Sequence, residues 1–286
     1  MIERTFRAMG TEWFLSADGC GGVALDRAQQ HVLREERRFS RFRPNSALSR
    51  LNRERSLRDP VVAAVMRKSL QFRRWTKGAF DPTVGGDVIT AGYSRSFEEI
   101  AGQELQVTGI VSEHPDISVM GDRVELRGGG FVDLGGLVKG WTVDRVSRLL
   151  VEAGACSYLV DGGGDIRIGM PFAGREEWAI GAGNGHVLRL TSGAVATSSS
   201  LVRTWQTDRG KAHHIITPAS GEAASGPFVT AAVIAPDAMS ADVLATALIA
   251  DASRALPLLP RFHAEALLES RDGQWVMTPG IQKWLN

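Results

Sequence analysis

The stretch DLGGLVKG, residues 133–140, places three glycines and a lysine between an apolar segment and an amphipathic run. A glycine-rich turn that opens a helix often binds phosphate through its backbone N–H groups, and a lysine adds positive charge. A Walker loop would need Ser or Thr after Gly-Lys, but Lys139 is followed by Gly140. The dinucleotide fingerprint also fails, because Arg167 stands where GGGDIRIG (162–169) would need its third glycine. Local rules therefore favour a structural turn between strand and helix over a phosphate loop.

Amphipathic helices and short strands alternate on both sides of this stretch. Apolar periodicity predicts helices over 23–39, 60–76, 141–153 and about 240–250, and a short helix after the turn RPNSAL (43–48). Strands are predicted at 11–17, 157–163, 166–170, 177–182, 186–199, 212–218 and 228–236, with a hairpin over 264–278 that turns at Asp272-Gly273. Residues 80–86 are expected to form a rigid loop, and 91–130 are the least regular part, with weak strands at 116–120 and 123–128.

This order of elements predicts an α+β fold in which helices cover one side of a largely antiparallel sheet. No linker, repeat or low-complexity segment divides the chain, so residues 1–286 are expected to form a single domain of two intimate lobes.

The composition indicates an ordinary globular protein. The chain is 43% apolar and 23% charged with a net charge of +1, which predicts neither a nucleic-acid partner nor membrane insertion. The arginines of REERRFSRFR (34–43) alternate with glutamates, as on a solvated helix face. Two cysteines, Cys20 and Cys156, are too few for a disulfide framework or a zinc site. Because the chain shows no signal-peptide pattern and no apolar run of spanning length, a cytoplasmic location is expected.

The predicted helix near residue 240 carries two candidate metal ligands. Asp242 and Thr246 are four residues apart and therefore share a face near the helix start, with Ser240 as the expected N-cap. Carboxylate and hydroxyl oxygens suit magnesium. Alternatively, Asp242 complements the helix dipole and Thr246 bonds back to a carbonyl.

Other polar residues also have two interpretations. His213 and His214 are adjacent, so in a strand they would point to opposite faces and would not share a metal; one of them is either catalytic or structural. In GAFDPTVGG (78–86), Pro82 fixes a turn that exposes Asp81, although Asp-Pro is also a common turn pair.

Eight motifs occur together in an order that resembles the ApbE family, the FAD:protein FMN transferases. The resemblance covers residues from about 5 to 250. The motifs are AMGTEW (8–13), SRFRPNSALSRLN (40–52), GAFDPTVGG (78–86), DLGGLVKGWTVDRV (133–146), LVDGGGDIRIG (159–169), SGAVATSSS (192–200), HHIITPASG (213–221) and SADVLATAL (240–248).

The resemblance implies a magnesium-dependent enzyme that cleaves FAD, attaches FMN through a phosphoester to a Thr or Ser of an acceptor protein and releases AMP. It also implies a T-fold-like α+β architecture with FAD held in a cleft between two lobes.

The resemblance further implies roles for individual residues. His214 would accept the proton of the acceptor hydroxyl, and Asp242, with Thr246 and the Gly136 carbonyl, would hold the metal. Flavin and FAD contacts fall on Met9, Phe42, Ala79, Phe80, Asp81, Asp133, Lys139, Ile215 and Ile216.

Two motifs depart from the family pattern. Where the family sequence is HIIDPxTG, this chain has Thr217 in place of the acid and Ser220 in place of the threonine. Where the family sequence is ATSGxYxR, this chain has Ser199 in place of the glycine and Leu201 in place of the tyrosine, and it keeps the arginine as Arg203. These departures leave two alternatives beside the transferase: a magnesium-dependent FAD pyrophosphatase that gives FMN and AMP, and a non-catalytic FAD-binding protein.

Overall fold

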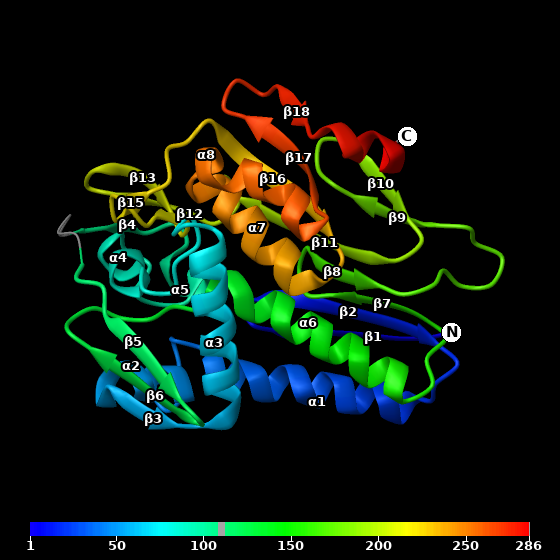
Figure 1. Cartoon of the computed structure of the whole chain (residues 1–286), viewed down its shortest axis with the longest axis horizontal. Coiled ribbons are helices and arrows are strands. Elements are labelled where there is room, and N and C mark those ends of the chain that lie inside the picture. The colour runs from blue at the N-terminus through cyan, green and yellow to red at the C-terminus, as the bar shows by residue number, and fades with distance from the viewer. Residues whose placement is uncertain (108–111, 286) are drawn as a thin grey trace.

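A single eight-stranded sheet forms the centre of the protein in the computed structural model, which describes residues 1–107 and 112–285 (Figure 1). Every neighbouring pair of strands in it is antiparallel. The strands are, in sheet order, β1 (Ile2–Ala8), β2 (Thr11–Asp18), β7 (Ser157–Asp161), β8 (Asp165–Ile168), β11 (Gly193–Ser199), β16 (Phe228–Ala235), β17 (Glu265–Ser270) and β18 (Trp275–Met277).

Three long helices cover one face of this sheet, as expected from the sequence (Figure 1). They are α1 (Gly22–Phe39), α6 (Gly135–Glu152) and α7 (Ala238–Ala250). α1 packs against β1 and α6, α6 against β7 and β8, and α7 against β11 and β16. Together they enclose the largest apolar core, which includes Trp13, Leu15, Val143, Val233 and Leu248.

A second apolar layer lies against the other face of the sheet. It consists of the hairpin β9 (Trp178–Gly181) and β10 (Val187–Leu190) with the 3-10 helix η2 (Pro279–Trp284). Ile180 and Leu188 of this hairpin pack with Val195 and Leu267 of the large sheet. The α+β prediction is therefore confirmed.

The remaining elements flank these layers (Figure 1). One group contains α2 (Ala47–Glu54), β3 (Ser56–Arg58), α3 (Pro60–Trp75), β5 (Asp116–Met120) and β6 (Arg123–Arg127). A second contains α4 (Gly85–Thr90), α5 (Phe97–Ile100), β4 (Glu104–Leu105), β12 (Thr204–Thr207), β13 (Gly210–His213), β14 (Ile216–Thr217) and β15 (Glu222–Ala223), and α8 (Ala252–Ala255) and η1 (Leu256–Phe262) follow α7. Residues 108–111 of the irregular segment 91–130 lie outside the described residues. None of the helices in the described ranges is long and apolar enough to span a membrane.

Several predicted strands were wrong in their bounds. The prediction for 11–17 omitted β1, whose alternating burial places charged residues on its outer side at the sheet edge. The single strand predicted for 186–199 is two strands of different sheets, β10 and β11, separated by Thr191 and Ser192. β11 begins at Gly193, whose φ of +120° suits glycine. The strand predicted for 212–218 is likewise broken by a bend at His214.

The starts of three helices also differ from the prediction. Gly85 and Gly86, predicted as loop, open α4. Residues 135–140, predicted as a turn ahead of a helix starting at 141, are the first turns of α6, although Gly136 keeps a non-helical ψ of 17°. At α7 the N-cap is Asp237, not Ser240: the Asp237 carboxylate accepts from the Ser240 N–H at 2.8 Å.

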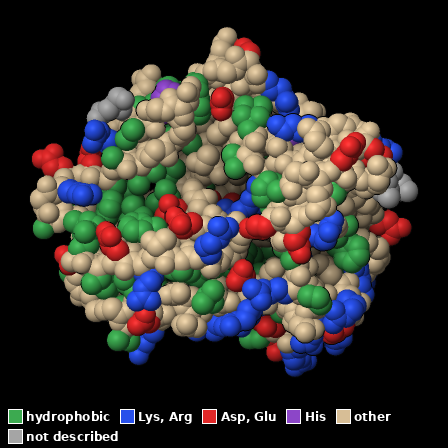
Figure 2. Space-filling model, turned by 180° about the vertical axis from the view of Figure 1, so that it is seen from behind, with side chains coloured by type: hydrophobic (Ala, Val, Ile, Leu, Met, Phe, Trp, Pro, Cys, Tyr) green, Lys and Arg blue, Asp and Glu red, His purple; other side chains and the backbone are tan. Residues whose placement is uncertain are grey.

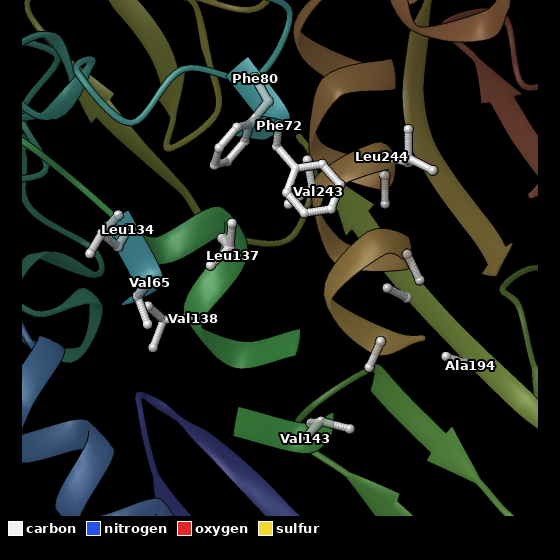
Figure 3. Packing of buried hydrophobic residues seen from close by; sticks show 14 of the residues in the cluster. Val65, Phe72, Phe80, Leu134, Leu137, Val138, Val143, Ala194, Val243 and Leu244 are labelled. Atoms are coloured by element: carbon white, nitrogen blue, oxygen red, sulfur yellow. The ribbon is translucent and has the colours of Figure 1, made fainter. Parts of the chain in front are cut away.

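The glycines of DLGGLVKG allow α6 and α7 to approach closely. A Cβ added to Gly140 would lie 2.4 Å from the Ala238 carbonyl oxygen, and one added to Gly136 would lie 3.3 Å from Thr246 Oγ1. These two contacts show that the helices run in opposite directions past each other. Figure 3 shows the apolar side chains of the same junction, with Leu137 on α6, Val243 on α7 and Phe80 beside them.

Replacing Gly140 by alanine tests this packing. We expect Gly140→Ala to destabilise the protein by about 1–3 kcal/mol or more, because backbone atoms of Ala238 and Met239 occupy the space of the new methyl group. Gly22→Ala is the matched control: Gly22 is likewise a glycine near the start of a long helix, but its Cβ would meet no atom within 4 Å. Equal midpoints for the two variants in urea unfolding would contradict the close approach.

Candidate active site

The glycine turn at the start of α6 is fixed by Asp133. One carboxylate oxygen of Asp133 accepts from the Gly135 N–H at 2.6 Å, and the other pairs with Arg41 Nε at 2.8 Å. The backbone before it is held by Asn52, whose side chain donates to the Val132 carbonyl at 2.9 Å and accepts from the Val132 N–H at 2.8 Å. The motif SRFRPNSALSRLN therefore supplies residues at both of its ends that position this turn.

α7 places Asp242 and Thr246 against the same turn. The Gly140 N–H, whose regular helical partner would be the Gly136 carbonyl, donates to Asp242 Oδ2 at 3.1 Å. Thr246 lies beside Gly136, and its hydroxyl is 3.2 Å from Ser198 Oγ on β11. Residues some hundred positions apart in sequence thus contact each other along the first turns of α6.

A buried group of charges surrounds this point. Lys139 Nζ forms an ion pair with Asp165 Oδ2, and both side chains are largely buried. Burial lowers the pKa of Lys139, but the negative charges of Asp165 and Asp242 more than offset this, so its pKa is raised. Burial, helped by the charge of Asp165, raises the pKa of Asp242 to about 7. Two buried carboxylates around one lysine leave an excess of negative charge that favours a bound cation.

An aromatic wall stands near this charged group. Tyr93, a buried residue of the irregular segment, stacks on Trp205 at 5.2 Å between ring centroids and contacts Phe42 at 5.4 Å. The guanidinium of Arg41 lies over the rings of both Phe42 and Tyr93. Phe42 is 37% exposed, so one side of it is open to a flat ligand.

His214 lies at the edge of this wall, 6.4 Å from Tyr93 between ring centroids. Burial, together with the positive charges of Arg203, His213 and Lys139, lowers its pKa to about 3. Its buried Nδ1 has no hydrogen-bond partner among the residues described. His213, by contrast, is bound through Nε2 to the Ala224 carbonyl at 2.9 Å, which indicates a structural role.

Met9 lies at the turn of the β1–β2 hairpin, where both Met9 and Gly10 have positive φ. Arg203 Nη2 donates to the Gly10 carbonyl at 3.0 Å and connects this turn to the site. The charge of Arg203 also helps to lower the pKa of His214, and it opposes the rise in the pKa of Asp165 that burial causes.

The other predicted contacts are more buried. Ala79 and Phe80 are buried in the main core, and Phe80 contacts the Gly136 position. Asp81 is paired with Arg73 at 2.7 Å and accepts from both the N–H and the hydroxyl of Thr83, so its carboxylate is engaged in holding its own loop. Ile215 belongs to the main core, and Ile216 to the smaller cluster that contains Trp205.

Sequence reasoning missed Arg41, Tyr93 and Asp165, and it gave Arg203 no role. Asp165 directly follows the three glycines 162–164 at the end of a predicted strand. Glycines in such a position indicate that the backbone closely approaches another group, and this was the one local sign that Asp165 belongs to a site. Nothing near Tyr93 in sequence indicates a site, because its partners come from elements far along the chain.

The donor chemistry of the α6–α7 junction fits a hard cation. A backbone carbonyl, a carboxylate and a hydroxyl are oxygen ligands of the kind magnesium takes in proteins. No cluster of three His, Cys, Asp or Glu side chains suited to a metal occurs in residues 1–107 and 112–285, so such a cation would depend on mixed backbone and side-chain oxygens.

The face opposite to that of Figure 1 is hollowed near its centre, with acidic and basic side chains at the rim (Figure 2).

Comparison with protein families assigns the chain. Residues 9–268 match the model of the ApbE family. The chain belongs to the ApbE family. Among its relatives, the FAD:protein FMN transferase of Treponema pallidum is 29% identical, over 79% of this chain and 70% of its own length. The FAD:protein FMN transferase of Escherichia coli strain K12 is 26% identical, over 85% of this chain and 76% of its own.

Solved ApbE structures share the architecture. The ApbE protein of Thermotoga maritima superposes with a TM-score of 0.86 at 25% identity, over 100% of this chain and 99% of its own. A mutant of the flavin transferase ApbE from Vibrio cholerae superposes with a TM-score of 0.81 at 22% identity, over 99% of each chain. The expected ApbE architecture is thereby confirmed.

The structure gives a reason for one departure from the ApbE pattern. The Thr217 hydroxyl donates to the Ala250 carbonyl at the C-terminal end of α7, at 3.0 Å. An ionised acid cannot donate this hydrogen bond and would add negative charge at the negative end of the helix dipole. Ser199 Oγ likewise has a partner, Thr230 Oγ1 at 3.2 Å.

Restoring the family acid is therefore expected to harm the protein. Thr217→Asp should lower the free energy of unfolding by about 1–2 kcal/mol, whereas Thr217→Ser, which keeps the hydroxyl, should stay close to the parent. Urea unfolding at pH 7.5 measures both. A more stable Asp variant would show that the Ala250 bond does not matter.

The raised pKa of Asp242 predicts a pH-dependent stability. Because the folded pKa of about 7 exceeds the ordinary 3.8, the stabilisation from its protonated form is complete below about pH 4 and is lost as pH rises through 7. Asp242→Asn removes this loss, and its amide oxygen can still accept from Gly140. In metal-free protein we expect Asp242→Asn to raise the melting temperature at pH 8 and to have little effect at pH 4.

Asp116→Asn, at an exposed position of β5, is the control and should change neither value. Scanning calorimetry in the presence of a chelator measures the melting temperatures. If Asp242→Asn lowered the melting temperature at pH 8, the result would contradict a destabilising buried negative charge at Asp242.

Proposed function

We propose that this protein is a magnesium-dependent FAD:protein FMN transferase that attaches FMN through a phosphoester to a Thr or Ser of an acceptor protein and releases AMP. The observation that carries the proposal is the α6–α7 junction, where Thr246 lies beside Gly136 and Asp242 accepts from the Gly140 N–H, with Lys139 paired to Asp165. Membership of the ApbE family and the names of its relatives support the same activity. The expected cytoplasmic location remains a prediction.

The cation would be held by the Gly136 carbonyl, the Asp242 carboxylate and the Thr246 hydroxyl. When bound, it would neutralise the pyrophosphate charge that develops as the phosphoanhydride bond breaks. Lys139 lies beside these ligands and Arg203 lies within electrostatic reach, so both are placed to bind phosphate oxygens. Asp165 orients Lys139 through their ion pair.

His214 is the proposed base for the acceptor hydroxyl. Nδ1 has no hydrogen-bond partner within the described chain, so in the tautomer protonated at Nε2 its lone pair would be available to accept a proton. The acceptor oxygen would attack the FMN phosphorus while its proton passes to Nδ1, and the bond to the AMP oxygen would break. The negative charge of bound phosphates would oppose the lowering of the His214 pKa by Arg203 and Lys139.

The flavin ring is proposed to lie on the aromatic wall. Phe42 offers its open side to the isoalloxazine, and Tyr93 and Trp205 support Phe42 and Arg41 from behind.

Incubation with FAD, Mg²⁺ and candidate acceptor proteins, followed by mass spectrometry, tests the proposal. The parent should add one FMN to a Thr or Ser. Asp242→Ala should abolish transfer through loss of the metal, and His214→Ala should slow it by roughly 10²- to 10⁴-fold. His213→Gln is the matched control and should transfer normally, because Gln can keep the bond to Ala224.

Other outcomes would reject the transferase. Free FMN and AMP formed with no adduct on any acceptor would identify an FAD pyrophosphatase instead. Tight FAD binding without any turnover would identify a non-catalytic FAD-binding protein.

A further inference from the structure

We infer that Arg41 is a flavin-recognition residue, whose guanidinium donates a hydrogen bond to a carbonyl oxygen of the pyrimidinedione ring of the bound flavin. This inference rests on the proposed function, since it assumes that the site takes a flavin nucleotide. Arg41 would thus contact the flavin ring of the ligand, and it is separate from the residues proposed to bind the metal and the phosphates.

The first observation is that Arg41 is held rigidly. Its side chain is 11% exposed, its Nε is bound to Asp133 Oδ2 at 2.8 Å, and its guanidinium carbon lies 4.2 Å from the ring centroid of Phe42 and 4.5 Å from that of Tyr93. A planar guanidinium fixed on one edge and stacked on two rings presents its remaining donors in a defined direction.

The second observation is an unused donor. Arg41 Nη2 is buried and has no hydrogen-bond partner in residues 1–107 and 112–285. A buried donor without a partner costs about 1–3 kcal/mol, so a ligand acceptor that satisfied it would gain affinity.

The third observation is the kind of ligand surface beside this donor. Arg41 contacts the aromatic wall, where Phe42 is partly exposed. It takes no part in the ion pair between Lys139 and Asp165 beside the proposed metal ligands. Because the guanidinium covers one face of the Phe42 ring, a flat ligand would meet it along the edge of the aromatic wall and would present its own edge there, not a phosphate. The flavin edge that carries hydrogen-bond acceptors is the pyrimidinedione, with its C2 and C4 carbonyls.

Binding of riboflavin and of FAD without metal or acceptor tests the inference. We expect Arg41→Gln to weaken both ligands by the same factor, about tenfold or more, in fluorescence titrations, because the lost contact is to the ring. Arg43→Gln is the matched control: Arg43 is exposed, pairs with Glu36 at 3.4 Å and should leave both affinities unchanged. ADP, which has no flavin ring, should bind Arg41→Gln and the parent equally.

The reduction potential of bound riboflavin supplies a second readout that a merely structural role would not move. Reduced flavin gains negative charge at N1 and the C2 carbonyl, so loss of the guanidinium should lower the midpoint potential. Arg41→Lys, which keeps the charge, should restore most of the potential.

Flavins with sulfur in place of the C2 or the C4 oxygen test the parent protein directly, in case Arg41→Gln does not fold. Sulfur is a weak acceptor, so the parent should bind one of the two thioflavins several-fold more weakly than riboflavin. The position affected identifies the carbonyl that Arg41 contacts.

Loss of FAD affinity in Arg41→Gln with riboflavin affinity intact would overturn the inference in favour of a phosphate contact. Equal binding of riboflavin and both thioflavins by the parent would overturn it as well. If the parent bound no flavin at all, the proposed function itself would fail. If Arg41→Gln left both FMN transfer and riboflavin affinity unchanged, only the inference about Arg41 would be rejected.

Discussion

The close approach of α6 and α7 is the constraint on which the site depends. Gly136 and Gly140 are four residues apart and present one side-chain-free face, and α7 fills it with Thr246 at one end and Ala238 at the other. The same approach lets the Gly140 N–H reach Asp242 Oδ2. The same two glycines therefore set the helix packing and the positions of Asp242 and Thr246 relative to α6.

Charge is concentrated where this packing excludes water. Asp165 and Asp242 lie on different layers of the fold, and the junction brings both within electrostatic reach of Lys139. The raised pKa of Asp242 shows that the protein alone does not satisfy its charge fully. The aromatic wall of Phe42, Tyr93 and Trp205 supplies an apolar surface near the charged group. The combination suits a ligand with an anionic pyrophosphate at one end and a flat ring at the other.

Local sequence signals predicted the parts of this arrangement that have a strong period or a short spacing. Helices α1, α3 and α7 follow from apolar repeats, and Asp242 and Thr246 follow from spacing on one helix face. β1 was missed because its outer residues are charged, and the break at His214 was missed because the flanking residues favour strands. Arg41 and Asp165 gain their roles only through long-range partners, Asp133 and Lys139, which no local pattern predicts.

The most direct test of the shared oxygen site is a crystal structure of the protein with FAD and Mn²⁺, located by its anomalous scattering. Mn²⁺ takes the same hard oxygen ligands as Mg²⁺. We expect one Mn²⁺ peak bonded at about 2.0–2.3 Å to the Gly136 carbonyl, Asp242 and Thr246, next to the FAD phosphates. A peak on the phosphates with Asp242 and Thr246 out of bonding distance would contradict it.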